Sequence, residues 1–182
     1  LLLEEKDKAY VSIHDNLKIL EDQSFLWTSE RDGYNHIYHY NAQGNLIRQL
    51  TRGKWEVTSV FVVNPKTKEL YYQSVEQGST ERQLYAIKLS GKGKRVLQNS
   101  KGTHGANFSA DGSYYIHSFS DEQTPPKYAL YETKKNSLIG GWFQAFLDFI
   151  FLSTIQMIWT FGYYNYICSF CSTPIFSKIT RR

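Results

Sequence analysis

The sequence is poor in cysteine and contains no block of like charge, and both absences narrow the classes of function. It has 182 residues, two cysteines and a formal net charge of +4. No run of five or more like charges occurs, so a nucleic acid partner is disfavoured. Residues 1–136 lack cysteine and need no disulfide framework, so they do not indicate a redox compartment. The opening LLLEEKDKAY also lacks the basic start and long apolar core of a signal peptide.

Charge is distributed unevenly along the chain. Nearly all of it lies in residues 1–136, whereas residues 137–182 hold only Asp148, Lys178, Arg181 and Arg182. The same C-terminal part contains both cysteines and many aromatic residues. Two different kinds of sequence therefore meet near residue 137.

An internal repeat is the most informative feature of the N-terminal part. Three short apolar strands, Phe25-Leu26-Trp27, Leu70-Tyr71-Tyr72 and Tyr114-Tyr115-Ile116, recur at spacings of 45 and 44 residues. A second set, Ile37-Tyr38, Leu84-Tyr85 and Leu130-Tyr131, recurs at spacings of 47 and 46 residues. Turn-forming residues such as Asp32-Gly33 separate the apolar segments.

The second unit shows the pattern most clearly, with four strands expected over residues 57–63, 70–74, 83–89 and 94–98. A four-stranded unit that repeats every 40–50 residues or so is typical of a β-propeller blade. We therefore predict an all-β fold, a partial β-propeller of three four-stranded antiparallel blades. The alternative is a β-sandwich of three similar hairpin pairs. Propellers close with roughly 4–8 blades, so we expect the chain to be a fragment of a larger protein.

Several segments also resemble one known family. The stretch TSERDGYNHIYHYNAQGNLIRQLTRGKWEV, residues 28–57, closely resembles the N-terminal propeller domain of the dipeptidyl peptidase IV family, within the prolyl oligopeptidase family of serine peptidases. Residues 4–11 and 102–131 resemble it as well, and the similarity extends from about Glu4 to Ile139. The string RQLTRGKWEV at residues 48–57 is its most specific part.

This resemblance implies a role for a larger parent protein. It implies a parent with an eight-bladed propeller that caps an α/β-hydrolase domain. The hydrolase domain would carry a Ser-Asp-His triad and remove dipeptides or tripeptides after proline. The propeller would filter substrates by size. The chain would supply the last three blades, with the remaining blades, the hydrolase domain and proline-containing peptides as partners. The resemblance also implies a periplasmic, extracellular or cell-surface location.

The catalytic parts of that family are not found in the sequence. A nucleophile of this type lies in Gly-x-Ser-x-Gly, and this string occurs nowhere in the 182 residues. We therefore predict a non-catalytic chain with no catalytic, cofactor-binding or metal-binding residues and no cofactor. The pair Glu4-Glu5 could be mistaken for the family's glutamate clamp for the substrate amino terminus. It lies at a different place in the family pattern, and we expect a solvated surface pair.

The histidines and tryptophans are expected to be structural. His36 and His39 are three apart on a strand, so they point to opposite faces and cannot share a ligand. His14, His104 and His117 have no cysteine or carboxylate partner at metal-site spacing. Trp27, Trp55 and the tyrosines are expected in the core rather than on a stacking platform.

The C-terminal part departs from the blade pattern. The repeat predicts a last strand around residues 139–144, but the family pattern stops near Ile139, at Gly140-Gly141-Trp142. We therefore divide the chain into a partial propeller, residues 1–139, and a hydrophobic aromatic tail, residues 140–182.

Three interpretations of the tail stay open. It is the product of a reading-frame shift or mis-assigned gene end, a membrane span over the uncharged residues 149–177, or a buried helix. The Cys168-Ser-Phe-Cys171 spacing lacks the further ligands of a zinc site and is taken as chance. The alternative function is a stand-alone propeller that binds proteins, tethered to a membrane by this tail.

Overall fold

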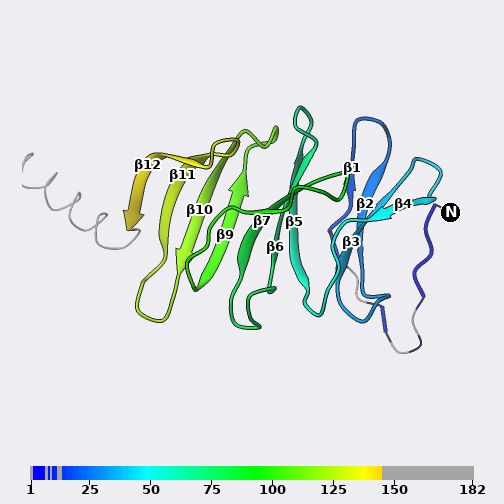
Figure 1. Cartoon of the computed structure of the whole chain (residues 1–182), viewed down its shortest axis with the longest axis horizontal. Helices are drawn as coiled ribbons and strands as arrows, with labels where there is room; N and C mark the ends of the chain where they lie inside the picture. The colour runs from blue at the N-terminus through cyan, green and yellow to red at the C-terminus, as the bar shows by residue number, and fades with distance from the viewer. Residues whose placement is uncertain (1, 7, 9, 12–13, 145–182) are drawn as a thin grey trace, which may run out of the picture. The chain divides into compact units, whose positions relative to one another are not determined.

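The chain forms three four-stranded antiparallel sheets that follow one another along the sequence (Figure 1). The computed structural model describes residues 2–6, 8, 10–11 and 14–144. All the regular secondary structure within these residues consists of β-strands. The predicted all-β propeller blades are confirmed, and the two-layer sandwich is wrong, because three separate sheets are present.

Strands that are consecutive in the sequence are also neighbours in each sheet. The first sheet contains β1 (Lys18–Ile19), β2 (Phe25–Ser29), β3 (His36–Tyr40) and β4 (Leu46–Gln49). The second contains β5 (Val57–Asn64), β6 (Glu69–Ser74), β7 (Gln83–Lys88) and β8 (Arg95–Val96). The third contains β9 (Thr103–Phe108), β10 (Tyr114–Ser120), β11 (Lys127–Glu132) and β12 (Ser137–Gln144).

The turns form where the sequence supplies residues that tolerate tight backbone geometry. Gly33, between β2 and β3, has φ +87°, and its N–H donates to the carbonyl of Glu30 at 2.7 Å. Between β5 and β6, the Asn64 side chain accepts hydrogen bonds from the N–H groups of Lys66 and Thr67 at 2.9 and 3.1 Å. These local devices set the hairpins independently of the core.

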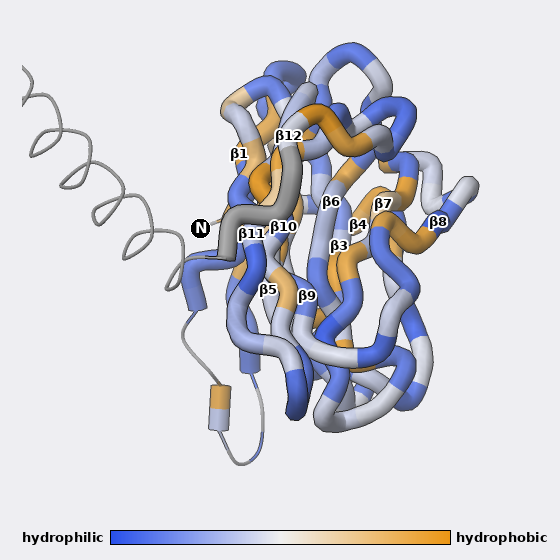
Figure 2. The backbone as a smooth tube through the Cα atoms, turned by 90° about the vertical axis from the view of Figure 1, so that its left-hand side faces the viewer, coloured by the Kyte–Doolittle hydropathy of each residue, from blue (hydrophilic) through white to orange (hydrophobic). Residues whose placement is uncertain are grey.

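The second sheet is buried on both faces, and strand alternation explains how. Leu70 and Tyr72 of β6 pack with residues of the first sheet, such as Leu26, whereas Tyr71 packs with residues of the third, such as Tyr115. Side chains of successive strand residues point to opposite faces, so one apolar run serves two interfaces. Figure 2 shows hydrophobic segments along the strands of these sheets.

The outer faces of the first and third sheets differ. On the first sheet, Phe25 and Tyr40 are buried, and Leu3 of the N-terminal segment packs against their cluster. On the third sheet, Tyr114, Ile116 and Tyr128 keep 49%, 49% and 39% of their surface exposed. The third sheet therefore presents an apolar face that lacks such a cover from the described residues.

The third sheet has its fourth strand. β12 runs over Ser137–Gln144 and so continues past Ile139, where the family pattern was expected to stop. The division into residues 1–139 and 140–182 stays a prediction. The proposed membrane segment 149–177 and the Cys168–Cys171 pair lie outside the described residues. Among the residues that are described, no helix is long and apolar enough to cross a membrane.

Candidate functional site

A cavity of about 380 Å³ lies where the N-terminal segment meets the first sheet. Its walls include Glu5 and His14 from that segment. Its walls also include Trp27 and Ser29 of β2 and Arg31 of the loop that follows β2. The site thus combines a carboxylate, a guanidinium group and aromatic rings from segments distant in the sequence.

Glu5 is the polar centre of this cavity. Its carboxylate accepts a hydrogen bond from the indole N–H of Trp27 at 2.8 Å, another from the Ser29 hydroxyl, and longer ones from Arg31 at 3.4 and 3.5 Å. Only 18% of the Glu5 side chain is exposed. The expectation of a solvated pair is therefore wrong for Glu5, because the segment folds back onto β2. It holds for Glu4, which is 55% exposed and pairs with Lys6 at 2.9 Å.

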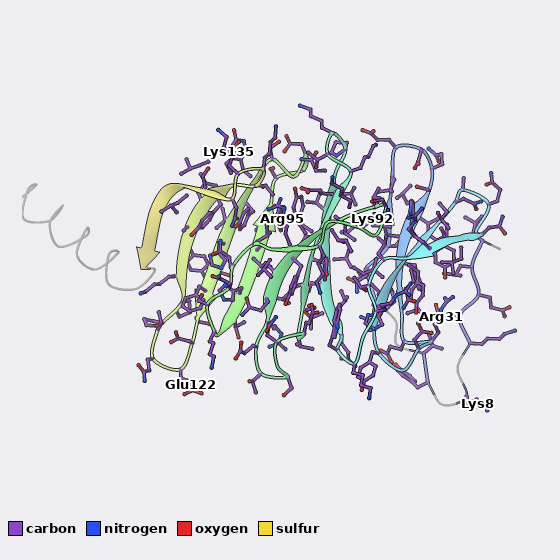
Figure 3. The ribbon with its side chains drawn as sticks, viewed as in Figure 1. Lys8, Arg31, Lys92, Arg95, Glu122 and Lys135 are labelled. Atoms are coloured by element: carbon purple, nitrogen blue, oxygen red, sulfur yellow. The ribbon has the colours of Figure 1, made fainter. Side chains whose placement is uncertain are left out.

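Arg31 connects the carboxylate to the aromatic surface of the first sheet. Its guanidinium carbon lies 4.6 Å from the centre of the Tyr38 ring, a cation–π arrangement, and its Nε donates to the Ser29 hydroxyl at 3.0 Å. The side chain remains 36% exposed. Figure 3 shows Arg31 beside the loop end of the first sheet. Arg31 and Glu5 carry opposite charges and pair with each other, so they add no net charge to the cavity wall.

His14 belongs to the cavity wall and not to a ligand set. Its Nε2 lies 2.8 Å from the Thr28 carbonyl oxygen, and its ring lies 4.4 Å from that of Trp27. Within the described part of the chain, no group of three or more histidine, cysteine, aspartate or glutamate residues could hold a metal ion. The cavity presents polar and aromatic groups to solvent, and its hydroxyl groups, Thr28 and Ser29, hydrogen-bond to the His14 ring and the Glu5 carboxylate.

The structure separates His36 from His39. The Nε2 of His36 lies 3.0 Å from the Gly53 carbonyl oxygen, whereas the Nε2 of His39 lies 3.0 Å from the Ser24 hydroxyl. These partners come from opposite ends of the first sheet. Burial lowers the pKa of His39 below its usual range.

Trp27 and Trp55 differ in their surroundings. Trp27 is half-buried at the cavity, whereas Trp55 packs against the core between the first and second sheets. The Lys94 ammonium lies 4.9 Å from the Trp55 ring and 4.8 Å from the Tyr85 ring, and it pairs with Glu76. The Trp55 and Tyr85 rings therefore already contact a cationic side chain of the protein, Lys94.

Sequence reasoning missed one pair of residues. His104 of β9 and His117 of β10 are both buried, and their Nδ1 and Nε2 atoms lie 2.8 Å apart. The pair forms because the strand register places His104 opposite Phe119, so that His117 is its diagonal neighbour. Two histidines on adjacent apolar segments were the only available signal, since register cannot be read from spacing alone.

Comparisons with known proteins point to one group of relatives. The family model described as "Dipeptidyl peptidase IV (DPP IV) N-terminal region" matches residues 1–126. Dipeptidyl peptidase 4 of Arthroderma otae is 32% identical over 122 residues, 65% of this chain and 16% of the relative. Dipeptidyl peptidase 4 of Trichophyton rubrum is 37% identical over 108 residues, 58% of this chain and 14% of the relative.

A solved structure agrees with these relatives. The crystal structure of Porphyromonas gingivalis dipeptidyl peptidase 4 superposes with a TM-score of 0.64 at 34% sequence identity. The matched part covers 69% of this chain and 18% of that one. The chain therefore spans less than a fifth of the length of each of these relatives.

Proposed function

The chain belongs to the family of dipeptidyl peptidase IV N-terminal regions, and on that premise we propose that it forms part of the substrate-gating propeller of a dipeptidyl peptidase IV-like serine peptidase. In this role the chain would form part of the wall that restricts substrate access, and it would supply no catalytic residue. The parent enzyme would release dipeptides or tripeptides after proline. The remaining blades, an α/β-hydrolase domain and proline-containing peptides would be its partners, outside the cytoplasm.

One observation carries this proposal. The family match over residues 1–126 covers the first two four-stranded sheets and β9 and β10 of the third, and each sheet packs on the next through an apolar interface. Sheets stacked in this manner form a rigid wall, which a size filter requires. The exposed apolar face of the third sheet, with Ile116 at 49% exposure, is suited to the packing of a further blade.

The absence of chemistry can be tested directly. We expect the purified 182-residue chain to leave a glycyl-prolyl chromogenic substrate intact, because the sequence contains no Gly-x-Ser-x-Gly nucleophile string. The P. gingivalis relative serves as the positive control. Release of chromophore that co-purifies with the chain through two separate columns would contradict the non-catalytic role.

The gating role needs a chimera. Residues 17–136 would replace the corresponding blades of the P. gingivalis relative, and cleavage of a short proline-containing peptide would be compared with that of the same sequence at the terminus of a folded protein. We expect the chimera to cleave the short peptide and exclude the folded protein, and the unaltered relative is assayed in parallel. The matched control carries Leu70→Asp, which breaks the interface between the first two transplanted sheets. A folded chimera that cleaves both substrates equally would overturn the gating role.

The alternative is a stand-alone protein-binding module. The same exposed face of the third sheet would then meet a separate protein instead of another blade. Sequencing the genomic DNA past codon 139 in the other reading frames distinguishes the two. A hydrolase continuation with Gly-x-Ser-x-Gly supports the peptidase parent, and its absence from every frame supports the binding module.

A further inference from the structure

His104 and His117 form a hydrogen-bonded pair at the junction of the second and third sheets. Their rings are nearly parallel, with an interplanar angle of 9° and centroids 5.0 Å apart. The nitrogen atoms that face each other lie 2.8 Å apart. Residue exposures of 0% and 1% show that solvent barely reaches either residue. Two ionisable rings are thus in contact in the interior.

Neighbouring groups fix the protonation of His104. Its Nε2 lies 2.8 Å from the carbonyl oxygen of Ser100, which can only accept, so Nε2 carries the proton. The Nδ1 of His104 is then the acceptor, and the Nε2–H of His117 is the donor. A second proton on His104 would have to bind at Nδ1, where it would face the N–H of His117. The bond between the rings could then form only in the opposite direction, with the His117 proton moved to its Nδ1 and a positive charge left on the buried His104 ring.

Protonation of His117 is also unfavourable. It would place a full charge among aromatic rings, with Tyr131 of β11 at 5.8 Å and Tyr115 of β10 at 6.4 Å between ring centres. Burial lowers the pKa of His117 to about 4, and the neighbouring His104 adds to this effect. Burial also lowers the pKa of His104, against the raising effects of the Ser100 carbonyl and of Glu81 in the loop between β6 and β7.

The pair lies where the third sheet is joined to the second. The side-chain amide of Gln73 in β6 donates to the His104 carbonyl at 2.6 Å. The N–H of His104 donates to the carbonyl of Arg82, next to β7, at 2.8 Å. These two bonds to the main chain of residue 104 help to hold β9 against β6 and β7, next to the buried ring pair. Figure 1 shows β9 beside these strands.

We propose that the His104–His117 pair is an acid-sensitive latch between the second and third sheets. At neutral pH both rings are uncharged, and the donor chain from His117 through His104 to the Ser100 carbonyl is complete. Uptake of a proton by either ring places a positive charge in the interior. That charge favours a state in which β9 and β10 separate from β6 and β7 and the rings reach water.

The direction of the pH effect follows from the difference in proton binding between the two states. The separated state binds protons with the ordinary histidine pKa of 6.5, whereas the closed state binds them only near pH 4 at His117. The closed state is therefore fully favoured above pH 6.5 and loses its advantage as the pH falls toward 4. At pH 5, His117 alone would raise the population of the separated state by about 30-fold over its value at pH 7.5.

Hydrogen exchange tests the latch in the full-length chain. Protection factors, corrected for intrinsic exchange rates, would be compared at pH 7.5 and pH 5 for residues 103–120 and for residues 25–40. We expect protection over 103–120 to fall by about 30-fold at pH 5, with less than about a threefold change over 25–40. An equal fall in both segments would overturn the proposal.

Variants separate the latch from general acid sensitivity. In the double variant H104Q/H117F, the glutamine can still donate to Ser100 and no titrating ring remains, so the acid response of residues 103–120 should drop below about threefold. His14→Gln, in the N-terminal segment beside the first sheet, is the matched control and should keep the full response. An undiminished response in the double variant would contradict the latch.

Histidine NMR of the unaltered chain gives a readout that does not depend on a variant folding. The His117 ring should stay neutral to below pH 5 while the chain remains folded. Titration of His117 near pH 6.5 in the folded chain would overturn the proposal.

Discussion

The carboxylate of Glu5 accepts a hydrogen bond from the indole N–H of Trp27 at 2.8 Å. The same carboxylate binds the Ser29 hydroxyl and Arg31, so one side chain of the N-terminal segment is held by three residues of β2 and the loop after it. This anchor brings Leu3 onto the outer face of the first sheet, where it packs beside Phe25. The cover of that face therefore depends on a buried polar contact as well as on apolar contact.

Replacing Glu5 should loosen this anchor. We expect Glu5→Gln to lower the free energy of unfolding by about 1–2 kcal/mol, because the charge-assisted bonds to Ser29 and Arg31 are lost. Glu4→Gln is the matched control and should change it by less than about 0.5 kcal/mol, since Glu4 is largely exposed. Urea denaturation followed by circular dichroism measures both. Equal effects of the two substitutions would argue against the anchor.

Two buried tyrosines at the sheet interfaces should respond in opposite ways to loss of their hydroxyl. Within the described residues, the Tyr72 hydroxyl has no hydrogen-bond partner, whereas the Tyr115 hydroxyl donates to Asn136 at 2.6 Å and accepts from Gln98 at 2.9 Å. Tyr72→Phe should be neutral or stabilise the fold by up to about 1 kcal/mol, and Tyr115→Phe should destabilise it by about 1–2 kcal/mol. Thermal unfolding of both variants at neutral pH provides the measurement, and a larger loss for Tyr72→Phe would be inconsistent with this bonding pattern.

Much of the fold could be predicted from the sequence because local signals agree with the repeat. The strands expected over 57–63 and 83–89 are observed as β5 and β7, with ends that differ by one residue. Apolar runs bounded by turn residues carry this information without knowledge of tertiary contacts. The strand β12 was harder to predict, because Gly140 and Gly141 weaken a strand pattern that its pairing with β11 nevertheless supports.

The candidate site could not be predicted in the same way. Glu5 meets Trp27 only because the N-terminal segment folds back over β2, and nothing in the spacing specifies that path. His104 and His117 meet only through the register of β9 against β10. A one-residue slip of that register would turn one ring to the other face of the sheet. Contacts of this kind depend on the assembled sheets and not on the segments that carry the residues.

Gly33 should be needed for its backbone conformation and not for its small size. Its φ of +87° is unfavourable for residues with a Cβ, although a Cβ there would meet nothing within 4 Å. We expect Gly33→Ala to lower the free energy of unfolding by about 1 kcal/mol. Gly78→Ala is the control: it has no positive φ, and its nearest neighbour is the Glu81 Cγ at 4.0 Å, so it should be within about 0.5 kcal/mol of the parent chain. Similar losses for both would point to a general intolerance of these loops to alanine.

Asp111 should titrate at an unusually low pH. Its carboxylate accepts hydrogen bonds from the hydroxyls of Ser109 and Ser113 and from the Ser113 N–H, at 2.7, 2.5 and 3.1 Å. These bonds, those from Ser113 first, lower the pKa of Asp111 from 3.8 to about 2. A lowered acid pKa stabilises the turn between β9 and β10 above pH 3.8, and this contribution is lost as the pH falls through about 2. Carboxyl-carbon NMR of the folded chain should therefore place its midpoint well below 3.8, and Ser113→Ala should raise it. A midpoint at or above 3.8, or no change in Ser113→Ala, would show that these hydroxyl bonds do not form in solution.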